Sequence, residues 1–245
     1  MQRPTWLTPW ACLKVYGLLQ AACMAWLLAT HWQAIASPTP QPAQPNMRRA
    51  AVTPHPAVAP IPRDAVRHQQ SLKREAHQAW GLGAPLATFA AQVHQESRWR
   101  ANAASPVGAQ GMAQFMPATA ADMAKRYPAE LRPANPHNPR WAFRAQAQYM
   151  KSLYDGRGAH GAVDSCERMA FAAASYNGGE GWVIRDRALA KQLGRDSTLF
   201  FRGAQSVNAG RSAEAKKENA AYPARILLNI EPRYVRAGFG RGSCN

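Results

Sequence analysis

The protein has 245 residues, of which 47% are hydrophobic, and its 30 Lys and Arg against 14 Asp and Glu give a formal net charge of +16. This apolar content excludes a wholly disordered chain, and four cysteines are too few for a small scaffold built on disulfides. A polytopic membrane protein is also excluded, because a long apolar run occurs at the N-terminus alone. The excess charge predicts an anionic partner, and nucleic acid, a phospholipid surface and an acidic cell-wall polymer all qualify.

Residues 1–36 have the features of an export signal. They contain two basic residues and no acid, an apolar run over residues 15–30, and the sequence Ala34-Ile35-Ala36, which fits an A-x-A cleavage site. The run is short for a membrane-spanning helix, which needs about 20 residues. The sequence therefore predicts an exported protein of the periplasm or cell envelope. An uncleaved segment that tethers the chain to the inner membrane is the alternative.

Residues 37–64 are predicted to form a proline-rich linker. Eight prolines lie between residues 37 and 62, a density that favours extended, hydrated chain over a packed core. We interpret the segment as a tether, with a trimmed pro-segment as the alternative. Residues 65–245 then form one domain, which is long enough for a single core. The basic character is not due to the leader, because removing the leader's two bases leaves a net charge of +14.

Helical periodicity runs through nearly all of residues 65–245, and alternating strand patterns are almost absent. Local signals mark helix ends: prolines can open a helix, Asp164 with Glu167 resembles a capping box, and Gly178-Gly179 resembles a C-terminal stop. The sequence thus predicts a mainly α-helical domain. Helices are expected to begin at Pro85, Pro117 and Asn138-Pro139, to run from Asp164 to Gly178, and to include Val183 to Leu189 and Ile226 to Ile230.

The domain contains two cysteines, Cys166 and Cys244. In an exported protein an even pair predicts a disulfide. The bond would close a long loop and hold the C-terminus on the domain, an effect of about 4 kcal/mol if it acts by constraining the unfolded chain. Two free buried thiols are the alternative.

Glu96 is the candidate for the chemistry. On the helix expected from Pro85, an apolar face formed by Leu86, Phe89 and Val93 continues to positions 96 and 97. A carboxylate is costly on a buried face, and the negative end of the helix macrodipole opposes it further. Both effects raise a carboxyl pKa toward the protonated form that a general acid needs. The alternative is a Glu that turns to solvent at a fraying helix end.

Two further stretches have the composition of a sugar-binding cleft. Residues 105–119 read SPVGAQGMAQFMPAT, in which glycines permit close backbone approach and Gln114 offers both a donor and an acceptor. Residues 174–179 read ASYNGG and place Tyr176 and Asn177 at a helix end. Flat apolar surfaces with a few polar groups are typical of binding clefts. The acid, the loop and the Tyr-Asn corner together therefore predict a glycan cleft.

Glu96-Ser97, GAQGMAQFMP and ASYNGG resemble the three signature motifs of the soluble-lytic-transglycosylase family of peptidoglycan-cleaving enzymes. The segment from Glu218 to Tyr222 is similar to the family's closing Glu…Tyr motif. The resemblance extends from about Leu82 to Tyr234, with the motifs in the family's order and approximate spacing. It implies a lysozyme-like helical fold, which agrees with the periodicity.

The resemblance also implies roles for single residues. Glu96 matches the catalytic acid/base, and Ser97 matches the residue that supports it. The family's GLMQ reads Gly111 to Gln114 here and its AYNAG reads Ser175 to Gly179, so the shape of the subsites is more in question than the chemistry. The residues assigned to substrate binding are Ser97, Ser105, Gln114, Met116, Tyr176, Asn177 and Tyr222.

The number of carboxylates favours a transglycosylase. Ordinary glycosidases use two carboxyl groups about 5–10 Å apart, whereas we find one acid, Glu96, at the centre of the motifs. The resemblance implies that the C6 hydroxyl of N-acetylmuramic acid (MurNAc) attacks the anomeric carbon. Cleavage of the β-1,4 bond to N-acetylglucosamine (GlcNAc) then leaves 1,6-anhydromuramyl ends. A hydrolysing muramidase is the alternative, with Glu180 as its second carboxylate.

Other function classes fit less well. The charge favours a nucleic-acid binder, but export removes that partner, and a non-enzymatic glycan-binding module would be expected to lack Glu96. No metal or cofactor is predicted, because the seven His residues are scattered and no zinc or phosphate-binding motif is complete. The expected partners of a monomeric chain are peptidoglycan strands and the anionic envelope surface. Three biological roles are alternatives: wall turnover, assembly of an envelope-spanning machine, and phage lysis by an endolysin.

Overall fold

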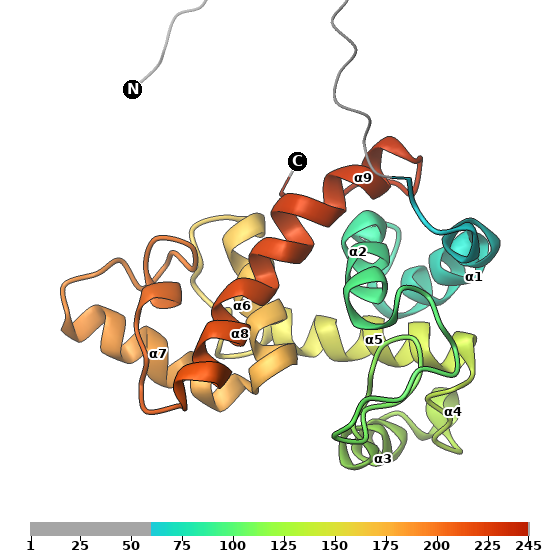
Figure 1. Cartoon of the computed structure of the whole chain (residues 1–245), viewed down its shortest axis with the longest axis horizontal. Helices are drawn as coiled ribbons and strands as arrows, with labels where there is room; N and C mark the ends of the chain where they lie inside the picture. The colour runs from blue at the N-terminus through green and yellow to red at the C-terminus, as the bar shows by residue number, and fades with distance from the viewer. Residues whose placement is uncertain (1–59, 245) are drawn as a thin grey trace, which may run out of the picture. The chain divides into compact units, whose positions relative to one another are not determined.

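The computed structural model describes residues 60–244, which form a helical domain (Figure 1). The export signal expected at residues 1–36 and nearly all of the expected linker at residues 37–64 lie outside the described residues, so the division into segments stays a prediction. Within residues 60–244, no helix has both the length and the apolar character needed to cross a membrane.

The described part of the chain is built from helices. Residues 60–244 contain no β-strand, and their β-pairing is limited to the isolated bridges Ala104–Gln110 and Gln110–Phe115. The prediction of a mainly α-helical domain is therefore confirmed. The elements are α1 (Arg63–Trp80), α2 (Leu86–Ser97), α3 (Pro117–Arg126), α4 (Pro128–Leu131), α5 (Pro139–Asp155), α6 (Ser165–Gly178), α7 (Glu180–Gln192), η1 (Ala204–Ser206), α8 (Ala213–Ala224), the π-helix η2 (Arg225–Ile230) and α9 (Glu231–Arg236).

Local signals in the sequence determine several helix ends. The Asn138 side chain accepts hydrogen bonds from two N–H groups in the first turn of α5. Asp164 accepts one from the Glu167 N–H at 2.8 Å at the start of α6. The expected capping box is incomplete, because the Glu167 carboxylate accepts instead from the backbone N–H groups of Phe200 and its neighbour. Glu167 therefore ties a distant loop to α6.

The sequence did not indicate α1, which begins at Arg63 and packs along α5. Its Glu75 is buried, and the carboxylate lies 2.6 Å from Arg144 and 3.2 Å from Arg140, both on α5. A buried carboxylate needs such partners, because an unpaired buried charge is costly. Pairing with a helix more than 60 residues away is a tertiary feature without a local sequence signal.

The C-terminal helix is longer than expected. The sequence indicates a helix over Ile226 to Ile230, whereas α8, η2 and α9 follow one another without a break from Ala213 to Arg236. We call this element the C-terminal rod. Pro223 lies within it and lacks the N–H that an α-helical bond requires, and the wider turns of η2 begin two residues later.

The C-terminal rod joins the helices that hold the candidate residues. Its η2 and α9 segments pack against α2, and its α8 segment packs against α6, as Figure 1 shows for the long red element. The end of α2 carries Glu96 and the end of α6 carries Asn177. The rod therefore places one side chain against each of these ends.

The C-terminal tail is held at two points. Cys166 at the start of α6 and Cys244 form the disulfide that the sequence predicts. The buried Glu231 of α9 accepts hydrogen bonds from the backbone N–H groups of Ser243 and Cys244, each at 3.1 Å. The Thr88 hydroxyl of α2 also donates to Glu231. These bonds attach the tail to α6 and to the α2–α9 pair.

Candidate active site

Glu96 lies in the last turn of α2 and accepts a hydrogen bond from the C-terminal rod. Its donor is the hydroxyl of Tyr222, a side chain only 2% exposed. Burial raises the pKa of Glu96 to about 7, Tyr222 and Arg225 lower it in part, and Glu218 raises it. A carboxyl group with this pKa is partly protonated at neutral pH, as a general acid must be. The direction is the one expected from the helix face.

Two other carboxylates, those of Glu180 and Glu218, have partners of their own. Glu180 at the start of α7 accepts a hydrogen bond from the Gly158 N–H at 2.9 Å, so it anchors a loop. Glu218 on α8 acts on Glu96 through its charge and is itself ion-paired with Arg225. The carboxylate that influences Glu96 is therefore Glu218, which the sequence had placed only in the closing motif.

The loop over residues 103–115 folds back onto the end of α2. The Ser97 hydroxyl donates to the Met112 carbonyl at 2.9 Å, and Ser97 is only 2% exposed. Ser97 is thus placed to hold the loop rather than to touch a ligand. Gly111 has φ +74°, and a Cβ there would overlap the Pro136 carbonyl. Glycine is therefore required at this motif position.

Three candidate binding residues take different positions near this loop. Gln114 Nε2 donates to the Gly111 carbonyl at 2.8 Å, so the loop itself uses this amide nitrogen. Ser105 Oγ accepts from the Ala109 N–H at 2.9 Å inside a turn. Met116 is 42% exposed directly before α3. Of the three, Met116 presents its side chain most openly to solvent.

Tyr176 connects α6 to the same loop. Its hydroxyl donates to the Ala113 carbonyl at 2.7 Å, and its ring lies 5.3 Å from Tyr149 and 5.9 Å from Phe115 between centroids. Burial, followed by the charge of Glu96, keeps the pKa of Tyr176 well above its usual value. The hydroxyl therefore remains a hydrogen-bond donor, and the aromatic cluster forms a wall of the site.

Asn177 is exposed, and its amide is held by the C-terminal rod. Asn219 Nδ2 donates to Asn177 Oδ1 at 3.1 Å and to the Ala174 carbonyl at 2.7 Å. A Cβ on Gly178 would lie 2.5 Å from Asn219 Nδ2. The glycine that replaces the alanine of AYNAG is therefore explained, because Asn219 occupies the space of a methyl group.

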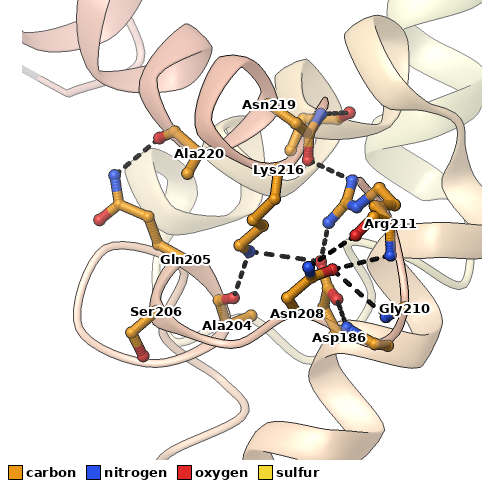
Figure 2. A network of polar contacts seen from close by, with 12 residues as sticks. Asp186, Ala204, Gln205, Ser206, Asn208, Gly210, Arg211, Lys216, Asn219 and Ala220 are labelled. Atoms are coloured by element: carbon orange, nitrogen blue, oxygen red, sulfur yellow. Dashed lines mark hydrogen bonds and ion pairs between the residues drawn. The ribbon is translucent and has the colours of Figure 1, made fainter. Parts of the chain in front are cut away.

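A buried ion pair orients Asn219 in turn (Figure 2). Arg211 donates to Asn219 Oδ1 at 2.7 Å and pairs with Asp186 of α7. Asp186 also accepts from the Ala209 N–H at 2.9 Å and lies 3.5 Å from Lys216 Nζ. Figure 2 shows Arg211 between Asp186 and Asn219. The side chains of this pair are only 5% and 4% exposed.

The surface beside Asn177 is hollowed by a cavity of about 440 Å³. Its lining includes Asn177, Trp182, Ser212 and Glu218. An apolar ring together with a few polar groups suits a sugar. Asn177 and Glu218 therefore belong to one concave surface.

Several residues of the site escaped the sequence analysis. Gln92 had a usable signal, since it lies one helical turn before Glu96 on the same buried face and interrupts an apolar pattern. Gln146, Asp186 and Arg211 had no such signal, because they come from separate segments. Within residues 60–244, no cluster of three or more His, Cys, Asp and Glu side chains could hold a metal ion. The expectation of no metal or cofactor stays a prediction.

Comparison with known proteins places these motifs in a family. Residues 72–199 match the family described as "Transglycosylase SLT domain". The chain is 34% identical over 112 residues to a membrane-bound lytic murein transglycosylase F of Shewanella loihica, covering 46% of this chain and 21% of the relative. It is 32% identical over 154 residues to the protein of the same name from Aliivibrio fischeri, covering 63% and 26%. The chain thus spans about a quarter of the length of these relatives.

A solved structure shares the fold. The 70 kDa soluble lytic transglycosylase of Escherichia coli matches with a TM-score of 0.50 and 22% sequence identity, covering 72% of this chain and 25% of that one. At this identity the match concerns the fold alone. The lysozyme-like helical fold expected from the motifs is therefore confirmed.

Proposed function

The chain belongs to the transglycosylase SLT domain family, and on that premise we propose that it is a peptidoglycan lytic transglycosylase. Its reaction is cleavage of the β-1,4 bond between MurNAc and GlcNAc, with a 1,6-anhydromuramyl end as product. The names of the relatives support the activity. The observation that supports the mechanism most directly is a half-buried carboxyl group, Glu96, whose pKa is raised to about 7.

Glu96 acts first as acid and then as base. The protonated carboxyl group donates its proton to the glycosidic oxygen, and the bond from that oxygen to the anomeric carbon of MurNAc breaks. The MurNAc C6 hydroxyl attacks the same carbon, and the Glu96 carboxylate accepts the hydroxyl proton. The proton is restored to Glu96 and no water is consumed. The Tyr222 hydroxyl, which donates to Glu96 Oε1, stabilises the carboxylate formed between the two steps.

The proposed reaction differs from hydrolysis in using one carboxyl group, that of Glu96. A hydrolase needs a second carboxyl group to activate water or to form a covalent intermediate. Glu218 is engaged by Arg225, and Glu180 is engaged by the Gly158 N–H. These contacts support a reaction in which the substrate's own hydroxyl replaces water.

The candidate binding residues divide into three groups. The first group lines the substrate side of the site and consists of Tyr176, Asn177 and Met116. Asn219 binds the Asn177 side-chain oxygen, which leaves the Asn177 amide nitrogen for the substrate. Ser97 and Ser105 hold the 103–115 loop. Gln114, which donates to the Gly111 carbonyl, and Tyr222, which donates to Glu96, form the third group. Loss of the first group should raise KM, and loss of the second group should lower stability.

The proposed place of action is the cell envelope. Peptidoglycan carries peptide carboxylates, so the excess of positive charge in this chain favours accumulation at the wall. Such attraction is screened over about 8 Å at physiological salt. Retention of the inactive Glu96→Gln variant on sacculi should therefore fall as salt rises. Retention that does not change with salt would remove charge from this part of the proposal.

Mass spectrometry of digested sacculi tests the reaction. A transglycosylase releases muropeptides whose MurNAc ends are lighter by one water than those of a hydrolase and are not reducible by borohydride. Reducing MurNAc ends as the main product would establish a muramidase instead. Binding without release of fragments by the wild-type protein would establish a non-enzymatic module.

A further inference from the structure

Two glutamine side chains are buried in the core behind Glu96. Gln92 on α2 is 1% exposed and Gln146 on α5 is fully buried. A buried amide is costly unless it forms hydrogen bonds. Both glutamines lie one or two hydrogen bonds from the Tyr222 hydroxyl, which donates to Glu96. We propose that Gln92 and Gln146 are positioning residues that direct the Tyr222 proton onto Glu96 Oε1.

The direction of the whole chain of hydrogen bonds is determined by a backbone carbonyl. Gln146 lies 3.2 Å from the Phe89 carbonyl oxygen, which can only accept, so Gln146 must present its Nε2 there. The same nitrogen donates to Gln92 at 2.8 Å, which requires Gln92 to present its Oε1. The opposite orientation of the Gln146 amide would place its Oε1 against two other oxygens, the Phe89 carbonyl oxygen and Gln92 Oε1. In the observed orientation Gln146 Oε1 has no hydrogen-bond partner among residues 60–244. One unpaired oxygen costs less than two contacts between oxygens.

The remaining group of Gln92 then determines the role of Tyr222. With Oε1 used, Gln92 turns its Nε2 to the Tyr222 hydroxyl oxygen at 3.3 Å. This oxygen therefore accepts from Gln92, and its single proton is left for Glu96. We call Gln146, Gln92, Tyr222 and Glu96 the amide chain. All of its bonds point from the core toward the acid.

The direction has a chemical consequence at Glu96. A donor on Oε1 leaves Oε2 to carry the proton of the acid form. It also stabilises the carboxylate, since a hydrogen bond to the charged form lowers a pKa. A donor whose oxygen also accepts a hydrogen bond is polarised and donates more strongly. The inference rests on the proposed function, in that Glu96 must be the acid for this direction to matter to catalysis.

A titration of Glu96 tests the inference without substrate. The carboxyl carbon is followed by NMR in protein labelled at Glu, in the wild type and in Tyr222→Phe, Gln92→Leu and the double variant. Tyr222→Phe should raise the Glu96 pKa by about 1, from loss of a charge-assisted hydrogen bond. Gln92→Leu should raise it by about a third as much. In the Tyr222→Phe background, Gln92→Leu should add nothing.

The groups that face Glu96 are otherwise left in place in these variants. They are Glu218 on α8, Arg225 on η2 and Tyr176 on α6. Met150→Leu is the matched control, because its sulfur contacts Gln92 Nε2 at 3.6 Å and the substitution leaves the amide chain intact. This control should titrate as the wild type does.

Gln146→Met provides a second route if Gln92→Leu does not fold. It releases Gln92 to present its oxygen to Tyr222 and compete for the proton, so the Glu96 pKa should rise again. A Glu96 pKa unchanged in every folded glutamine variant would overturn the inference, as would equal shifts with and without Tyr222. Because no substrate is used, this outcome is separate from a failure of the proposed reaction. If that reaction holds, Gln92→Leu should lower kcat several-fold and leave KM unchanged.

Discussion

Two chains of hydrogen bonds reach the candidate site, and they are built from different groups. The amide chain reaches Glu96 through neutral side chains. The second, which we call the charged chain, runs from the Asp186–Arg211 ion pair through Asn219 to Asn177. Each chain fixes the direction of its last hydrogen bond, but formal charges support Asn177 while amides support Glu96.

The difference follows from what each supported group must do. In the proposed reaction Glu96 exchanges a proton, and a formal charge within about 4–6 Å would shift its pKa strongly. The two charges that do act on it, Glu218 and Arg225, pair with each other and act in opposite directions. Asn177 does not titrate, so an ion pair can hold it without affecting its chemistry. Neutral support therefore leaves burial as the main influence on the acid.

Removing the acid should have the largest effect. Glu96→Gln keeps an acceptor for the Tyr222 hydroxyl but cannot exchange a proton. We expect release of soluble fragments from sacculi to fall by about 10²- to 10⁴-fold. Glu180→Gln is the control, since its amide oxygen can still accept from the Gly158 N–H and activity should be retained. Full activity of Glu96→Gln together with loss in Glu180→Gln would reverse the assignment.

Breaking the charged chain should cost the most stability. Asp186→Leu leaves Arg211 buried without its carboxylate, which typically costs about 3–5 kcal/mol. Urea unfolding should show a much smaller loss when Arg211→Met is added, because an apolar pair can replace a buried ion pair. Gln92→Leu in the amide chain should lower the free energy of unfolding by about 1–2 kcal/mol. Equal losses for Asp186→Leu and Gln92→Leu would remove the contrast between the chains.

The stability of the protein should depend on pH through Glu96, the titrating member of the amide chain. The Glu96 pKa is raised from 4.5 to about 7 on folding, so the folded protein binds the proton more tightly. Its contribution is therefore complete below pH about 4.5 and is lost as pH rises to about 7. Relative to Glu96→Gln, the wild type should lose up to about 3 kcal/mol over this range. Thermal unfolding at pH 4, 6 and 8 measures the difference, and parallel curves would contradict the raised pKa.

The smallest effect is expected at the junction of the charged chain with α6. Gly178→Ala places a methyl group 2.5 Å from Asn219 Nδ2, and such overpacking typically costs about 1–3 kcal/mol. In an Asn219→Ala background the remaining close atom is Arg211 Nη1 at 3.1 Å, the end of a long side chain, so the cost should fall. A double-mutant cycle of unfolding free energies measures the coupling. Additive costs would mean that Asn219 is not the reason for the glycine.

Much of the fold could be predicted from the sequence because its signals are local. Helical periodicity, the Asn138 cap and the Asp164 cap each depend on residues within a few positions of one another. The same holds for Glu96, whose burial follows from the apolar face of its own helix. The pair of cysteines needed only the redox rule for exported proteins. By contrast, α1 and the C-terminal rod were missed or shortened, since distant contacts stabilise them.

The sequence by itself determined a helical domain and the motifs around Glu96. The tertiary structure alone decided which side chains support them. Gln146 and Gln92 are 54 positions apart, and Gln92 and Tyr222 are 130 apart. No local pattern relates such residues, because hydrogen-bond direction depends on which atoms meet after the helices pack. A single backbone carbonyl, that of Phe89, then orients every donor in the amide chain up to the acid.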